Sequence, residues 1–120
     1  MTGVIAAVDD LFFGAKIAET AARLNVPLTL VPSHGDLEKK LRADKPALVI
    51  FDLNAEGCRP LEAIRRLKAD PELKAVVVLG FLSHVQQDLK TAALDAGCDR
   101  VMARSAFTAQ LPEILRAYTA

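Results

Sequence analysis

The chain has 120 residues, the usual size of one compact domain with a single hydrophobic core. Its 15 basic residues balance its 15 acidic ones, so the composition carries no electrostatic signature of binding to nucleic acid or to an anionic membrane. The longest apolar stretch, residues 75–82, is far shorter than the roughly 20 residues that a membrane-spanning helix needs. We therefore expect one domain over residues 1–120 that binds neither nucleic acid nor membrane.

The N-terminus and the cysteines indicate the compartment. The first apolar run has neither the basic start nor the small-residue cleavage site of a signal peptide, which predicts a cytoplasmic protein. Cys58 and Cys98 are far apart and form no C-x-x-C motif, so we expect free thiols in a reducing compartment. A redox switch is the less favoured alternative, because neither cysteine has a neighbouring resolving thiol.

Apolar runs alternate with helical periodicity along the whole chain. The runs predict five strands, at residues 4–8, 28–31, 47–51, 75–79 and 100–103. Apolar residues at a 3.6-residue spacing predict a helix after each strand. The inward positions of these helices are Phe13, Ile17, Ala21 and Leu24; Leu37 and Leu41; Leu61, Ile64 and Leu67; Val85, Leu89, Ala92 and Ala96; and Phe107, Leu111, Ile114, Leu115 and Tyr118.

Three local signals set helix boundaries. The segment Ser83-His84-Val85-Gln86 has the pattern of a capping box that opens the fourth helix, and Gly97 suits its C-terminal cap. Pro112 lies inside the last helical pattern, where it lacks a backbone donor, so this helix is expected to begin late or to bend.

Strands that alternate with helices predict a parallel sheet with helices on both faces, because crossover connections are almost always right-handed. For five strands the flavodoxin-like, doubly wound order is 2-1-3-4-5. This order places the first and third strands side by side. We therefore predict an α/β fold of five strands and five helices.

Three aspartates follow these two neighbouring strands. Asp9 and Asp10 end the first apolar run and Asp52 ends the third, so all three are expected at the same edge of the sheet. Carboxylates that close together repel one another unless a cation or another partner neutralises them, and a divalent metal is the simplest partner. The alternative, that Asp9 and Asp10 only cap the following helix, stays open.

The chain resembles the receiver domain of bacterial two-component response regulators (CheY-like) along essentially its full length. The resemblance rests on Val8-Asp9-Asp10, on the segment 49–54 with Gly57 and Leu61-Glu62, and on the segment 93–99, Ala-Leu-Asp-Ala-Gly-Cys-Asp. Each motif is weak alone. Together, in this order and at this spacing, they are a specific indication of the fold.

The resemblance implies a phosphorylation site. Asp52 would be the phosphoacceptor, Asp10 and Asp52 would bind Mg²⁺ directly, Asp9 would act through a bound water, and the backbone carbonyl of Asn54 would complete the ligands. The phosphoryl donor would be the phosphohistidine of a sensor histidine kinase or of a phosphotransfer protein. The chain would then be no enzyme beyond its own phosphorylation.

The chain departs from the family pattern at the positions that report phosphorylation. Gly80 stands where a threonine or serine is usual, Phe81 where a small residue is usual, and Val101 where many receivers have an aromatic ring. Arg104 replaces the usual lysine with a planar, forked cation. An ion pair between Arg104 and Asp52 and a solvent-exposed Arg104 are equally open, and the chain is an atypical receiver in either case.

Three functions follow, of which the sequence slightly favours the first. The chain is a single-domain receiver that accepts phosphate on Asp52, or a phosphorylation-independent receiver-like module that binds a protein through its fourth helix, fifth strand and fifth helix. A small enzyme or cofactor carrier is disfavoured, because no glycine-rich phosphate motif or nucleophile elbow is present. Participation of His84 in the site and homodimerisation through the last helix are left open.

Overall fold

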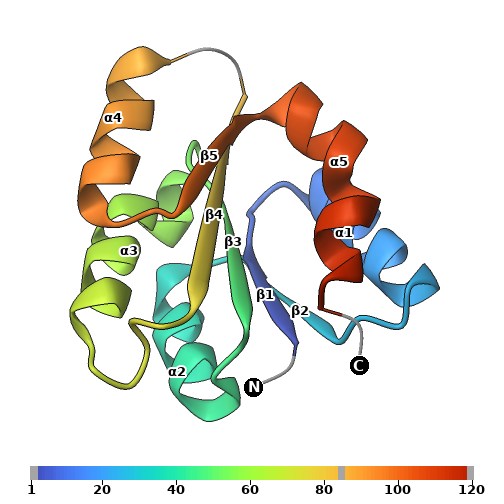
Figure 1. Ribbon diagram of the computed structural model, residues 1–120, viewed down its shortest axis with the longest axis horizontal. Coiled ribbons are helices and arrows are strands. Elements are labelled where there is room, and N and C mark those ends of the chain that lie inside the picture. Colours follow the sequence, from blue (N-terminus) through green and yellow to red (C-terminus); the bar gives the residue numbers. More distant parts are fainter. Residues whose placement is uncertain (1–2, 84–85, 119–120) are drawn as a thin grey trace.

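The fold is a five-stranded parallel sheet in the order β2-β1-β3-β4-β5 (Figure 1). The computed structural model describes residues 3–83 and 86–118. The strands are β1 (Val4–Ala7), β2 (Leu28–Val31), β3 (Leu48–Asp52), β4 (Val77–Leu82) and β5 (Arg100–Ala103). The predicted doubly wound order 2-1-3-4-5 is confirmed.

Helices cover both faces of the sheet. Helices α1 (Leu11–Arg23) and α5 (Arg104–Arg116) lie on one face, and α2 (His34–Asp44), α3 (Pro60–Ala69) and α4 (Gln87–Ala96) lie on the other (Figure 1). A short 3₁₀ helix, η1 (Glu56–Cys58), precedes α3. In the part of the chain that the structure describes, no helix has the length and apolar character needed to cross a bilayer.

The two faces of the sheet carry separate cores, because side chains alternate along each strand. Val49 and Phe51 of β3 join the core beneath α2, α3 and α4, whereas Leu48 and Ile50 join the core beneath α1 and α5. Burial on both sides explains why β1 and β3 are continuous apolar runs. The helix positions expected to face inward are buried or half-buried, except Val85, which lies outside the described residues.

The expected strand and helix boundaries differ in three places. Strand β4 was expected at residues 75–79 and instead runs from Val77 to Leu82, since turn hydrogen bonds hold residues 70–76 and pairing with β3 continues to Phe81. The expected late start of α5 is wrong. This helix starts at Arg104 and continues through Pro112, because Phe107, Leu111 and Leu115 anchor it on the sheet and offset one missing hydrogen bond.

The third difference is the start of α4. Ser83 is not its N-cap, since the helix begins at Gln87 and the N-cap position is Gln86, which makes no side-chain capping bond. His84 lies outside the described residues. Gly97 caps the other end of α4 with a φ of 115°, as expected.

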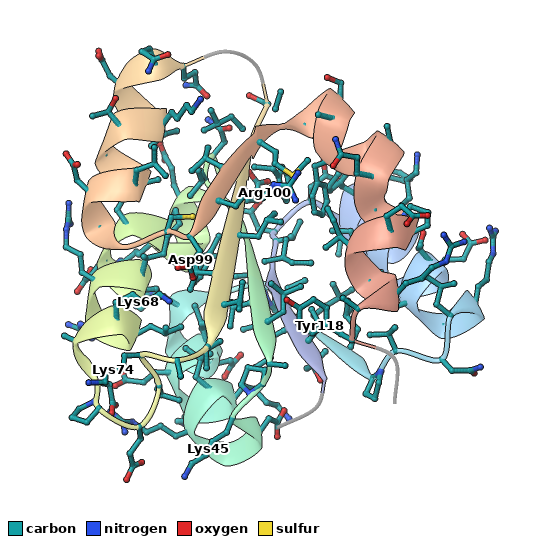
Figure 2. The ribbon with its side chains drawn as sticks, in the orientation of Figure 1. Lys45, Lys68, Lys74, Asp99, Arg100 and Tyr118 are labelled. Atoms are coloured by element: carbon teal, nitrogen blue, oxygen red, sulfur yellow. The ribbon has the colours of Figure 1, made fainter. Side chains whose placement is uncertain are left out.

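Lys68 connects α3 to the sheet. Its Nζ donates hydrogen bonds to the backbone carbonyls of Lys74 and Val76 and to Asp99 Oδ2, the last at 2.8 Å. The same Asp99 oxygen accepts the N–H of Val78 at 2.8 Å. Figure 2 shows Lys68 and Asp99 directed toward one another from α3 and from the residue before β5. One side chain thereby fixes the beginnings of β4 and β5 relative to α3.

Candidate functional site

The acidic site lies where β1 and β3 end. These strands pair in parallel register, with Ala7 opposite Phe51, so Asp9 and Asp10 leave β1 beside the end of β3. Asp52 is buried, with 7% of its surface exposed, whereas Asp9 is exposed. Burial is the main cause that raises the pKa of Asp52, and the charges of Asp9 and Asp10 raise it further. The three aspartates therefore follow neighbouring strands at the same edge of the sheet, as the strand order predicted.

The surroundings of Asp52 act on its pKa in both directions. Burial is the largest influence and raises its pKa above the ordinary value. The N–H of Asn54 donates to Asp52 Oδ1 at 2.9 Å, and this hydrogen bond and the nearby charge of Arg104 act in the opposite direction. The hydrogen bond from Asn54 and the charge of Arg104 thus offset only part of the cost of burying the charged Asp52.

Asp10 has partners for both of its oxygens. Oδ1 accepts the N–H of Phe13 at 3.1 Å and caps α1, while Oδ2 accepts Nη2 of Arg104 at 3.2 Å. The capping bond and then the arginine lower the pKa of Asp10. Asp10 therefore combines the helix-cap role that the sequence left open with an ion pair.

Arg104 binds Asp10 and not Asp52, which decides the question left open by the sequence. Its guanidinium carbon lies 4.0 Å from the centroid of the Phe13 ring. This cation–π contact and the ion pair direct the side chain toward the acidic edge. The guanidinium of Arg104 is thus held at this edge by Asp10 and by the Phe13 ring.

The donor atoms suit Mg²⁺ in kind, since this ion prefers carboxylate and carbonyl oxygens. Within residues 3–83 and 86–118, no three His, Cys, Asp or Glu side chains form a group able to hold a metal ion. Asp10, an expected direct ligand, is engaged by Phe13 and Arg104. With Arg104 on Asp10, the side chains therefore do not fit a magnesium site.

Phe81 is the neighbour of Asp52 on the adjacent strand β4. It is fully buried and lies directly opposite Asp52 in the pairing of β3 with β4. Its ring is 4.7 Å from that of Phe107, in a stacked arrangement, and 5.0 Å from that of Phe13. The ring is held by both neighbours and belongs to the core under α1 and α5. Movement of Phe81 away from Asp52 would disrupt this core.

Leu53 occupies the space that a side chain at position 80 would need. A Cβ built on Gly80 would lie 2.9 Å from Leu53 Cδ1 and 3.0 Å from Cδ2 and Cγ. Gly80 lies within β4, paired with Phe51 on one side and Val101 on the other. A threonine or serine at position 80 would thus require the side chain of Leu53, the residue after Asp52, to move.

Two features of the site were not anticipated from the sequence. The side chain of Asn54 bridges to the segment after β4: its Oδ1 accepts the N–H of Ser83 at 2.9 Å, and its Nδ2 donates to Gln86 Oε1 at 2.8 Å. Leu11 and Phe12 are 84% and 91% exposed beside the acidic edge. The exposed pair has a sequence signal, because Leu11, Phe12 and Phe13 are consecutive and cannot all face the core of one helix.

The cysteines lie in the core. Cys58 and Cys98 are buried and free, as expected. Burial raises the pKa of Cys58 to about 11, which leaves it protonated and unreactive at neutral pH. Neither thiol supports the alternative of a redox switch.

Comparison with solved structures defines the class of fold. The chemotaxis response regulator CheY4 of Vibrio cholerae has a TM-score of 0.84 at 14% identity, with 98% of each chain covered. The phosphorylated cyanobacterial phytochrome response regulator RcpA has a TM-score of 0.80 at 23% identity, over 97% of this chain and 89% of its own. The Mn²⁺-bound response regulator Rcp1 has a TM-score of 0.77 at 16% identity, over 98% and 91%.

No protein-family model and no curated protein sequence matches the chain. The likeness to response regulators therefore rests on structure, and at these identities it establishes the fold. This chain has the CheY-like fold of response regulator receiver domains.

Proposed function

We propose that this chain acts in two-component-type signal transduction as an atypical receiver module that binds a protein partner without phosphorylation of Asp52. The observation that carries the proposal is the engagement of Asp10 by Arg104 next to a buried Asp52. A receiver that accepts phosphate needs an accessible carboxylate and free neighbouring ligands for a cation. Here the neighbouring ligand is already paired.

The surroundings of Asp52 support this proposal independently. The fully buried Phe81 faces Asp52 across the β3–β4 pairing, and Leu53 fills the space where a hydroxyl-bearing side chain at position 80 would lie. A phosphoryl group on Asp52 would therefore lack a hydrogen-bond donor at position 80 and would meet an aromatic ring. Both features disfavour the negatively charged product.

The expected partner surface is formed by α4, β5 and α5. A hollow of about 120 Å³ lies between α4 and β5, lined by Gln87, Lys90 and Val101 among others. Val101 lines this hollow where many receivers have an aromatic ring, so no rotating ring at that position fills it. We expect a protein partner to use this surface in its resting shape. A sensor histidine kinase or a phosphotransfer protein is the partner class to test first.

The second candidate is phosphate acceptance on Asp52 in the presence of Mg²⁺. It is favoured by the position of Asp52 at the end of β3, within electrostatic reach of Asp9 and Asp10. Intact-mass analysis after exposure to acetyl phosphate, with and without Mg²⁺, distinguishes the two candidates. The proposal expects no phosphoryl adduct under either condition. A magnesium-dependent adduct that disappears in Asp52→Asn would establish the second candidate and overturn the proposal.

A further inference from the structure

The acidic site holds a permanent cation of its own. Arg104 Nη2 lies 3.2 Å from Asp10 Oδ2, and the charge of Arg104 also acts on Asp52, where it lowers the pKa that burial raises. Asp10, Asp52 and Arg104 thus share one electrostatic environment. A site of this kind needs a counter-charge, because carboxylates at close range repel one another. In this chain Arg104 supplies it.

Several contacts fix Arg104 in this position. Its guanidinium lies over the Phe13 ring, and the N–H of Phe13 is itself bound by Asp10 Oδ1. Asp10, Phe13 and Arg104 therefore form a closed set of three contacts. The Phe13 ring is supported by Phe81 and Phe107, at 5.0 and 6.0 Å between ring centroids. The arginine therefore lies on an aromatic cluster and differs from a freely moving surface residue.

The position of Arg104 in its helix supports the same conclusion. It is the first residue of α5, where the helix dipole disfavours positive charge and favours aspartate or glutamate. The first turn of α5 contains no acidic residue. A cation at this place is unfavourable for the helix alone, and the Asp10 carboxylate and the Phe13 ring offset this cost.

From these contacts we infer that Arg104 is the built-in counter-cation of the acidic site and takes the place of a divalent metal ion there. The native chain then binds neither Mg²⁺ nor Mn²⁺ at this edge. Removal of the guanidinium charge frees Asp10 Oδ2 and leaves Asp9, Asp10 and Asp52 with an unbalanced negative charge. These oxygens are the kind that Mg²⁺ and Mn²⁺ prefer. The variant chain therefore gains a metal site that the native chain lacks.

The test is calorimetric titration of Mg²⁺ and of Mn²⁺ into the native chain and into Arg104→Gln. The variant is expected to bind each ion at least ~10-fold more tightly than the native chain. Removing a positive charge about 4 Å from the bound ion changes its binding by more than tenfold at an effective dielectric of about 20. Its melting temperature is expected to rise with metal concentration, while that of the native chain stays constant. Arg100→Gln is the matched control, because Arg100 begins β5 and contacts Gln110 on the side of α5.

Arg104→Met provides a second variant that keeps an apolar contact with the Phe13 ring and removes the charge. Metal binding that is equally strong in the native chain and in both Arg104 variants would overturn the inference, as would an absence of metal binding in both folded variants. This outcome is separate from the proposed function. A native chain that binds metal but takes no phosphoryl group contradicts the counter-cation alone, whereas a phosphoryl adduct on Asp52 contradicts the proposed function.

Discussion

Asp52 and Asp10 at the acidic edge have pKa values that are shifted in opposite directions. Asp52 has a raised pKa because it is buried, whereas Asp10 has a lowered pKa because the Phe13 N–H and Arg104 stabilise its charged form. Folding therefore disfavours the charge on Asp52 and favours the charge on Asp10. The two aspartates should respond to pH in opposite directions.

The first prediction concerns Asp52→Asn. Because the pKa of Asp52 is raised in the folded chain, its contribution to stability is fully present below the ordinary aspartate pKa and is lost as pH rises through the folded value. Asp52→Asn removes this loss and should stabilise the fold at pH 7 by on the order of 1 kcal/mol, with no difference at low pH. Urea unfolding across this pH range measures the effect.

Asp10→Asn is the matched comparison for that experiment. The lowered pKa of Asp10 contributes stability above the ordinary aspartate pKa, and this contribution is lost as pH falls. Asp10→Asn should therefore be less stable than the native chain at pH 7. The electrostatic description would be wrong if both variants shifted stability in the same direction at pH 7.

The second prediction concerns Gly80. Gly80→Thr places a side chain within 3.0 Å of Leu53, so it should destabilise the fold by about 1–3 kcal/mol. In a Leu53→Ala background, which removes the neighbouring side chain, the same Gly80→Thr change should cost less. Equilibrium unfolding of the native chain, both single variants and the double variant tests the coupling. Gly35→Ala is the control, because a Cβ at Gly35 meets nothing within 4 Å. An equal cost of Gly80→Thr in both backgrounds would exclude the proposed contact.

Among the elements, periodicity predicted well what depends on local sequence. The five strands and five helices follow from apolar runs and 3.6-residue spacing, and most strand boundaries differ by at most one residue. The boundaries that differ depend on tertiary structure. Strand β4 extends to Leu82 because β3 and β5 pair with it, and α5 tolerates Pro112 because one face is anchored on the sheet. Neither effect is visible in the segment alone.

Partner choice at the site could not be predicted for the same reason. The strand order predicted that the three aspartates follow neighbouring strands at one edge, and the pairing of β1 with β3 confirms this placement. Whether Arg104 binds Asp10 or Asp52 depends on the aromatic ring of Phe13 beneath it, a contact between residues far apart in sequence. Likewise, the proximity of Leu53 to Gly80 follows from the register of β3 with β4.

The third prediction belongs to the connection between α3 and the sheet. Lys68→Met leaves the carbonyls of Lys74 and Val76 without their ammonium donor and should cost about 2 kcal/mol of unfolding free energy. Lys74→Met is the control on the neighbouring turn, because only the backbone carbonyl of Lys74 takes part in this contact; it should change stability by less than about 0.5 kcal/mol. The two lysines are labelled in Figure 2. Equal losses in thermal or urea unfolding would argue against a connecting role for Lys68.

At the scale of the whole molecule, a receiver fold is combined with an acidic edge that carries its own arginine. The sheet order and both helical layers match response regulators, and Arg104, Phe81 and Leu53 surround the carboxylate that would take phosphate. Under the proposed function, a protein partner binds the surface of α4, β5 and α5 while the packing around Asp52 disfavours its phosphorylation.

The most direct test of this account is the proton–nitrogen amide correlation spectrum of the native chain, recorded before and after addition of Mg²⁺ and acetyl phosphate. The account predicts that the amide signals of Asn54, Gly80 and Ser83, which surround Asp52, stay in place. Magnesium-dependent displacement of these signals, absent in Asp52→Asn, would show that the acidic edge takes up metal and phosphate and would contradict the account.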